Sequence, residues 1–494
     1  MRRSTSWRGF AGGRRQVPPS LPVTIASEPE GLAALERAVA RDLDMLQYPS
    51  RQWVLPRQTA SGEPILDVLV VGGGQGGLAV AAGLQRERVT NVLVVDEHVS
   101  DRAGPWLNFA RMVTLRTPKH VTGPDLGLPH LTIQAWYEAQ HGLGSWQELG
   151  LIPKETWAAY LSWYRRTLKL PVQCDTKATS LSWREGDGCF AATLVRDGAP
   201  QTVFARRVVL ATGIEGSGDW WVPAMITDAL PPERWAHTRH DIDFPALEGK
   251  RVAVLGAGAS AFDNASVALE HGASAVDLFF RRDRLVDVNA YRWAEFVGFL
   301  RHHADLPDAQ RWSFVRQILR MGQLPPTDTF GRASAHEAFT LHPGSPWTSV
   351  EMAGDVVRIT TPKGTHDADF VIVGTGFRTD LSKRPELAEI HAHVATWGDR
   401  FTPPPSEAHD DLLRHPYLGP SFQFVEREPG TAPWVQHVYN YTFGCLLSLG
   451  FGGASISGMK YSIPRLVGGI TRSLFCEDAE AYLQSLRAFD LKEF

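Results

Sequence analysis

The strongest hydrophobic pattern in the chain is an apolar run at residues 66–71 that ends in a cluster of glycines. Residues 78–82 follow with helical composition, and another apolar run covers 92–95. The same order of apolar run, glycine turn and helix start returns at 251–261, and a further apolar run covers 276–280. Strands that alternate with helices predict parallel sheets. We therefore expect an α/β fold with two Rossmann-like units.

The first glycine cluster fits the pattern G-x-G-x-x-G through Gly72, Gly74 and Gly77. Between a strand and a helix, the first glycine permits a tight turn, the second lets the backbone approach a pyrophosphate, and the third allows close helix packing. The helix N-terminus offers free N–H groups to the phosphates. Asp96, at the end of the next strand, is placed to accept a ribose hydroxyl. The pattern predicts a dinucleotide site, and the alternative is a glycine-rich turn without a ligand. The residues assigned to this site are Gly72, Gly74, Gly76, Gly77, Asp96 and Glu97.

The second unit reads G-x-G-x-x-A, and its next strand ends on two arginines instead of an acid. A guanidinium group at that place suits a ribose 2′-phosphate through charge-assisted hydrogen bonds. The alternative is that the arginine pair is a solvated strand end. Because the two units end differently, they imply two different nucleotides. The residues assigned to the second site are Gly256, Gly258, Ser260, Ala261, Arg281 and Arg282.

Several other segments complete the expected fold. Residues 29–47 predict an amphipathic helix, either a packing brace or a dimer contact. Residues 190–206 alternate as a hairpin does, and residues 290–347 predict helices with no strand. The strand at 369–373 echoes an earlier strand at 208–210, and we interpret it as the return of the chain into the first domain.

Small and aromatic residues outside the two turns also indicate contact with a cofactor. Trp106 follows a Gly-Pro pair just after the first ribose-binding strand, and small residues end both echoing strands. A glycine- and serine-rich segment around Gly453 precedes a closing helix, which we expect to begin near Pro464. The residues added to the cofactor sites are Trp106, Thr212, Gly213, Gly374, Thr375, Gly376 and Gly453.

Composition excludes several classes of protein. The net charge of −4 over 494 residues gives no reason to expect nucleic acid or an anionic membrane as partner. The four cysteines form no C-x-x-C pair, which argues against a disulfide scaffold, a metal site and a dithiol redox centre. The chain has no apolar run of membrane-spanning length and no secretory signal, so we expect a cytoplasmic protein, possibly a homo-oligomer.

Taken together, these motifs resemble the single-chain flavoprotein monooxygenases of class B, which include the flavin-containing, N-hydroxylating and Baeyer–Villiger enzymes. The resemblance covers about residues 65 to 475. It implies that the first unit binds FAD and the second NADPH, and that a flavin C4a-(hydro)peroxide oxygenates nitrogen, sulfur or a carbonyl group of a small molecule. His237 fills the histidine position of a fingerprint of this family, but Pro231, Glu233 and Asp241 depart from it.

The resemblance also implies the division of the chain. We expect an N-terminal extension at 1–62, an FAD-binding domain at 63–215 and 369–494, and an NADPH-binding domain at 216–368. The candidates for the flavin front and the nicotinamide face are Asn108, Arg111 and His237. Two alternatives stay open: a flavin reductase that passes electrons to a small molecule or carrier protein, and a non-catalytic FAD-binding redox sensor.

Overall fold

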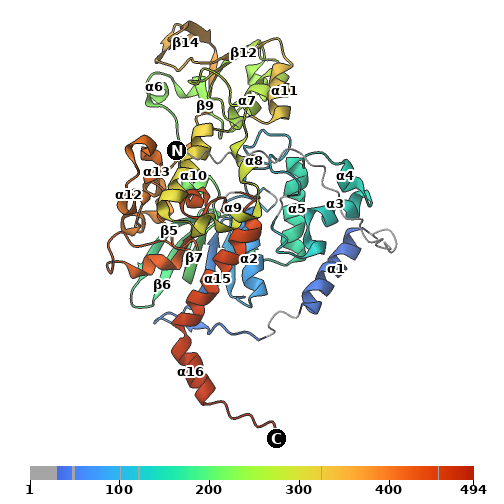
Figure 1. The fold of residues 1–494 in the computed structure, drawn as a ribbon, viewed down its shortest axis with the longest axis vertical. Coiled ribbons are helices and arrows are strands. Elements are labelled where there is room, and N and C mark those ends of the chain that lie inside the picture. The colour runs from blue at the N-terminus through green and yellow to red at the C-terminus, as the bar shows by residue number, and fades with distance from the viewer. Residues whose placement is uncertain (1–30, 47–50, 101, 121–122, 324, 454) are drawn as a thin grey trace, which may run out of the picture.

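The computed structural model describes residues 31–46, 51–100, 102–120, 123–323, 325–453 and 455–494 (Figure 1). Residues 1–30 of the expected N-terminal extension lie outside the described part. The helix expected in the extension is present as α1 (Leu32–Met45), with Leu35 and Val39 buried. The indole of Trp163 donates to Glu36 of α1 over 3.2 Å, so this helix acts as a brace on the helices beside the first sheet.

The first sheet carries the first glycine turn at its centre. β2 (Pro64–Val71) is parallel to a strand on each side, so that Val70 pairs with both Val94 and Val209. Helices cover this part of the sheet, and its strands are accordingly apolar on both faces. The predicted hairpin is present as β6 and β7, which pair antiparallel. The other strands of this sheet are β1 (Arg57–Gln58), β3 (Val92–Val95), β4 (Val172–Gln173), β5 (Thr176–Arg184), β6 (Cys189–Arg196), β7 (Ala199–Leu210) and β18 (Val438–Asn440).

Two helices from opposite ends of the chain pack together on this sheet. A Cβ atom on Gly83 of α2 (Gln75–Arg86) would lie 2.8 Å from a methyl group of Val467 in α15 (Met459–Glu477). α15 begins at Met459 and has Pro464 inside it, so the expectation that the closing helix begins near Pro464 was wrong. An internal proline removes one backbone hydrogen bond. The buried apolar face of α15 keeps the helix continuous through that position.

The second sheet is parallel throughout, in the order β12-β11-β10-β16-β9. Two expectations fail here. β12 (Phe339–His342) is a strand inside the segment expected to be helical. β16 (Phe370–Val373) pairs with β10, so the strand interpreted as the return to the first domain belongs to the second sheet. The remaining strands are β9 (Trp235–His237), β10 (Arg251–Leu255) and β11 (Ala275–Phe279).

The chain crosses between the two sheets twice, and the crossings pair with each other. β8 (Gly218–Trp220) on the way out is antiparallel to β17 (Phe377–Thr379) on the way back. The four-range division of the chain stays a prediction, but the return crossing begins after β16 instead of at residue 369. A small antiparallel sheet of β13 (Ser349–Ala353), β14 (Val356–Thr361) and β15 (Gly364–Ala368) extends the second unit.

Helices fill the space around and between the sheets (Figure 1). The second sheet, with α7 and α11, forms one end of the molecule, and the first sheet, with α2 and α15, lies toward the other. Among the described residues, no helix has the length and apolar character needed to span a membrane. The further helices are α3 (Ile133–His141), α4 (Ser145–Glu148), α5 (Lys154–Thr167), α6 (Ala224–Thr227), α7 (Ala259–Glu270), α8 (Ala290–Ala294), α9 (Val297–His302), α10 (Asp308–Met321), α11 (Thr327–Ser334), α12 (Trp397–Arg400), α13 (Asp410–Leu413), α14 (Leu446–Leu449) and α16 (Ala479–Arg487).

Candidate functional site

One cavity of about 960 Å³ is lined by residues of the first glycine turn, of the start of α7 after the second glycine turn, and of both crossings. It brings together most of the residues predicted to bind a cofactor. Those on its lining are Gly72, Gly74, Gly76, Asp96, Glu97, Trp106, Arg111, Thr212, Gly213, Ser260, Arg281, Thr375, Gly376 and Gly453. Those that it does not bring to the lining are Gly77, Asn108, His237, Gly256, Gly258, Ala261, Arg282 and Gly374.

The glycines of the first turn divide into two kinds. Gly72 has a φ of +106°, and a Cβ there would lie 2.5 Å from the carbonyl oxygen of Ala211. A Cβ on Gly77 would lie 1.8 Å from the oxygen of Gly72. Gly74, in contrast, has no protein atom nearer than 3.8 Å to that position. The protein's own packing therefore demands the first and third glycines, whereas the open space before Gly74 fits a pyrophosphate at the start of α2.

The second turn repeats this arrangement. Gly256 has a φ of +126°, and its Cβ would lie 2.3 Å from the oxygen of Gly374. A Cβ on Gly374 would in turn lie 2.7 Å from that of Ala261. Gly258 has nothing within 4 Å of its Cβ position. Gly374 therefore contacts the first glycine of the second turn as Ala211 contacts the first glycine of the first turn. This shared contact explains why the two strand ends are similar in sequence.

Asp96 ties the first turn to the end of the next strand. One oxygen of its carboxylate accepts from the backbone N–H of Gly73 over 2.7 Å, and the other accepts from the backbone N–H of His98 over 2.9 Å. A hydrogen bond in which the His98 ring donates to the Asp96 carboxylate raises the pKa of the His98 side chain. Glu97 pairs with Lys177 over 3.0 Å at the cavity wall. That Asp96 accepts a ribose hydroxyl stays a prediction.

The two arginines at the end of the second unit's strand have different surroundings. Arg282 donates to the backbone oxygens of Met321 and Arg320, and so caps the C-terminal end of α10. Arg281 lies on the cavity lining, and no described residue accepts a hydrogen bond from it. Of this pair, only Arg281 has a guanidinium without a described hydrogen-bond partner, and that it binds a 2′-phosphate stays a prediction.

Of the three candidates for the flavin front and the nicotinamide face, Arg111 lies on the cavity lining. Its guanidinium donates to the backbone oxygen of Asn108 and sits 5.5 Å from the ring centre of Phe244. The amide of Asn108 donates to the oxygens of Arg102 and Gly104, which fixes the loop beside Trp106. Asn108 therefore holds backbone and does not face the cavity.

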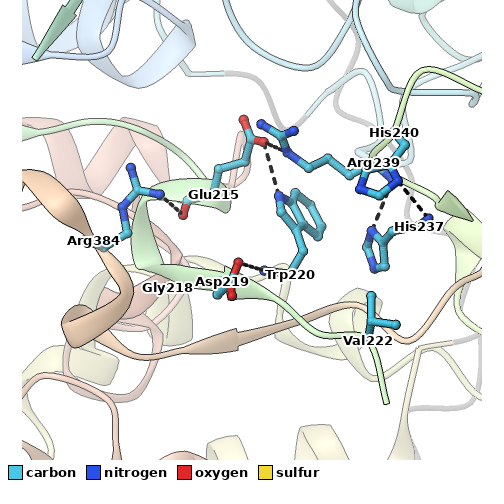
Figure 2. A pocket seen from close by; sticks show the side chains of 9 residues that line it. All are labelled: Glu215, Gly218, Asp219, Trp220, Val222, His237, Arg239, His240 and Arg384. Carbon is cyan, nitrogen blue, oxygen red and sulfur yellow. Dashed lines mark hydrogen bonds and ion pairs between the residues drawn. The ribbon is translucent and has the colours of Figure 1, made fainter. Parts of the chain in front are cut away.

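His237 lies in a separate pocket of about 350 Å³ (Figure 2). Its Nε2 donates to the oxygen of Gly376 over 3.1 Å, and its Nδ1 accepts from the backbone N–H of Arg239. Burial lowers the pKa of His237 to about 4, so the ring is neutral at physiological pH. Glu215 accepts from both Arg239 and the indole of Trp220, and these three residues line both this pocket and the main cavity. His237 therefore holds a crossing and does not reach the cofactor cavity.

Arg378 and Thr379 of β17, with His409 and Asp411 at the start of α13, form a third wall of the cavity. Sequence patterns gave no signal for this wall, because its two segments come together only in the folded chain. Two buried polar atoms on it, Thr379 Oγ1 and His409 Nδ1, have no hydrogen-bond partner among the described residues. Within the described residues, no group of three or more His, Cys, Asp or Glu side chains could hold a metal ion. The cavity residues that were missed include Arg116, Asp263, Asn264, Tyr291, Arg378, Thr379, Arg384, His409, Asp411 and Phe443.

The chain is similar to known flavoenzymes along nearly its whole length. Residues 69–215 match a family model described as FAD-NAD(P)-binding, and residues 146–314 match one described as L-lysine 6-monooxygenase/L-ornithine 5-monooxygenase. An FAD-dependent urate hydroxylase from Xanthomonas campestris pv. campestris is 44% identical over 463 residues, which cover 94% of this chain and 97% of the relative. The chain belongs to the FAD- and NADPH-dependent flavoprotein monooxygenases.

Solved structures of this group share the fold of the monooxygenase. An ornithine N-hydroxylase from Kutzneria sp. 744 superposes with a TM-score of 0.64 at 16% identity, over 83% of this chain and all of that one. An ornithine hydroxylase from Pseudomonas aeruginosa gives 0.64 at 15% identity over the same shares. The monooxygenase is thus an oxidoreductase that uses FAD, NADPH and O₂, and its two open glycine turns fit the two dinucleotides.

Replacing Gly74 with valine is expected to give colourless protein that still folds. The branched side chain fills the space left for the pyrophosphate, while Gly74 has a φ of −72° that valine tolerates. The measurement is the ratio of flavin to protein absorbance after purification, together with the melting temperature. Gly186→Val, at an open position away from the cavity, is the matched control and should keep its flavin. Full flavin occupancy in Gly74→Val would show that the turn does not hold the pyrophosphate.

Arg281→Ala is expected to lower kcat/KM for NADPH about tenfold to a hundredfold, because a hydrogen bond to a charged group contributes about 1.5–3 kcal/mol. The loss should appear mainly in KM, and the NADH parameters should stay as they are. Arg282→Ala is the matched control: it removes the cap of α10, so it should lower the melting temperature and leave the cofactor preference intact. Equal use of NADPH and NADH by the unmodified enzyme would contradict the assignment of Arg281.

Proposed function

We propose that the monooxygenase hydroxylates urate, or a closely similar planar anionic heterocycle. The relative that covers almost the whole chain at 44% identity is named as an FAD-dependent urate hydroxylase. The observation in the structure that carries the proposal is the third wall of the cavity, which neither glycine turn uses. Its polar groups suit a flat ring with carbonyl and N–H groups on its edges.

The third wall combines unpartnered hydrogen-bonding groups with positive charge. Thr379 lies on β17 with 4% exposure, and His409 directly precedes α13. Arg378, next to Thr379, stacks its guanidinium 4.3 Å above the ring of Trp221 and lies 3.8 Å from Asp411. A buried polar atom without a partner costs free energy unless a ligand satisfies it. A urate anion would supply hydrogen-bond partners for Thr379 and His409 and a charge for Arg378.

The reaction divides between the cofactors and the chain. Bound FAD and NADPH supply the hydride and the activation of O₂. The chain positions both dinucleotides through its glycine turns and keeps water out with the aromatic residues that line the cavity, among them Trp106, Phe109 and Phe443. Thr379 and His409 orient the substrate from the third wall.

A second candidate function is N-hydroxylation of an amine. It is favoured by the match of residues 146–314 to the lysine and ornithine monooxygenase model. That matched segment ends before the third wall begins, so it does not include the residues that we assign to the substrate. The two functions make different demands, because an amine substrate is cationic and urate is an anion.

We also propose that the protein acts in the cytoplasm and forms a homo-oligomer. Support for the oligomer comes from α16 and the residues after it, which carry exposed apolar side chains and extend from the body of the molecule (Figure 1). Size-exclusion chromatography with light scattering would test the oligomer, and a monomer at micromolar concentration would contradict it.

Urate is expected to accelerate NADPH oxidation by the FAD-loaded enzyme and to be consumed in equal amount. One oxygen atom from ¹⁸O₂ should appear in the product, with little H₂O₂. Ornithine, lysine and related amines serve as the comparison. Stimulation by an amine with ¹⁸O in a hydroxylamine product, and none by urate, would replace the proposal with the second candidate.

Thr379→Val is expected to raise KM for urate roughly twofold to tenfold, because one hydrogen bond to a neutral group contributes about 0.5–1.5 kcal/mol. Anaerobic reduction of the flavin by NADPH should keep its rate. Thr361→Val is the matched control, since Thr361 is buried in the small sheet outside the cavity. An unchanged KM in Thr379→Val would remove Thr379 from the substrate site.

A further inference from the structure

An ion pair between the two dinucleotide-binding units lies on the cavity lining. The guanidinium of Arg116, from the segment that follows the first unit's turn, donates to Asp263 Oδ2 over 2.8 Å. Asp263 belongs to α7, the helix that begins at the second glycine turn. Both residues line the cofactor cavity. The contact therefore joins the first unit to the helix of the second at the cavity wall.

Asp263 is an unusual neighbour for a dinucleotide. Its side chain is 3% exposed, and it lies close to the turn where the backbone offers its N–H groups to phosphate. A buried carboxylate at that place repels a diphosphate unless a positive charge offsets it. Thr329 of α11 donates to Asp263 Oδ1 over 3.0 Å, so each carboxylate oxygen has one donor and the group is fixed.

Arg116 has capacity left for a ligand. Its contact with Asp263 uses one of its terminal nitrogens, and within the described ranges no other residue accepts a hydrogen bond from it. Its side chain is 32% exposed on the cavity side of a fixed partner. The next residue of α7, Asn264, is 2% exposed, lines the same cavity, and has an Oδ1 atom without a partner. Arg116 and Asn264 thus both have unused hydrogen-bonding atoms near the start of α7.

We propose that Arg116 binds the diphosphate of the nicotinamide cofactor, and that Asp263 is the positioning residue that aims its guanidinium there. Other cations on the cavity lining, such as Arg111, Lys177 and Arg281, have no described contact with α7. Arg116 alone among these joins the first unit to the helix of the second. The inference rests on NADPH use and not on the identity of the oxygenated substrate.

Arg116 and Arg281 are assigned to different groups of the cofactor, Arg116 to the diphosphate and Arg281 to the 2′-phosphate. The 2′-phosphate distinguishes NADP⁺ from NAD⁺, whereas both carry the diphosphate. Arg116→Met should therefore weaken NADP⁺ and NAD⁺ by the same factor, about tenfold or more, while Arg281→Ala weakens NADP⁺ alone. The measurement is the equilibrium affinity of each nucleotide for the oxidised FAD-loaded protein, by calorimetry or flavin fluorescence.

A double variant tests whether Arg116 acts directly. In Arg116→Met the carboxylate of Asp263 stays behind without its counter-charge, and that alone would repel the nucleotide. Arg116→Met with Asp263→Asn removes both charges. An affinity deficit of at least about fivefold in the double variant supports a direct contact. Recovery of the original affinity would show that Arg116 only neutralises Asp263, and would overturn the proposal.

Two further variants guard against a general loss of structure. Glu270→Gln, on the same helix, breaks the pair of Glu270 with Arg332 outside the cavity and should leave both affinities unchanged. Arg116→Lys keeps the charge and should recover part of the affinity for both nucleotides. Flavin occupancy and melting temperature close to those of the unmodified protein show that a variant has folded. An Arg116→Met protein that folds and binds both nucleotides as tightly as before would overturn the proposal.

Discussion

The site depends on the pairing of the two crossings between the sheets. β8 and β17 form a two-stranded ladder, and the backbone N–H of Trp221 donates to the oxygen of Gly376 over 3.0 Å. The hydroxyl of Thr375 donates to the oxygen of Trp221, and His237 donates to the same oxygen of Gly376. Because the chain leaves and re-enters through this one ladder, the first glycine turn and the start of α7 are held toward a shared cavity. Burial keeps His237 uncharged, so this junction does not depend on a proton near neutral pH.

Within each unit, the same steric rule determines which small residues are fixed. The first glycine meets the residue that follows a neighbouring strand, Ala211 in one unit and Gly374 in the other. The last small residue is packed too, Gly77 against the oxygen of Gly72 and Ala261 against Gly374. Only the middle glycine faces open space, so a bound ligand, and not the packing of the protein itself, would exclude a larger side chain there. The structure therefore separates residues that the fold requires from those that the cofactor requires, although all of them belong to one motif.

The sequence was informative where a local rule determines the structure. Gly72, Gly74 and Gly77 between apolar runs require one kind of turn, and the structure has both units where the pattern predicts them. β12 was missed because its strand pairs only with β11, from a distant part of the chain, and its composition carries no separate signal. β16 was misplaced because the echo of the earlier strand reflects a repeated role within each unit and not a return to the first sheet. Arg281 and Arg282 are equivalent in the sequence, because only the folded chain brings the end of α10 to Arg282. The third wall carries no sequence signal, because β17 and the start of α13 meet only in the fold.

The order of strands in the first sheet has a consequence for how the protein is made. The second sheet uses only residues between Trp235 and Val373, so all its strands are present in one continuous stretch of chain. The first sheet begins with β1 and β2 but includes β18, and it is covered by α15, close to the C-terminus. During synthesis, which proceeds from the N-terminus, the unit with the second sheet can close while the unit with the first sheet is still incomplete. The unit with the first sheet, although it starts first, is the last to be finished on the ribosome.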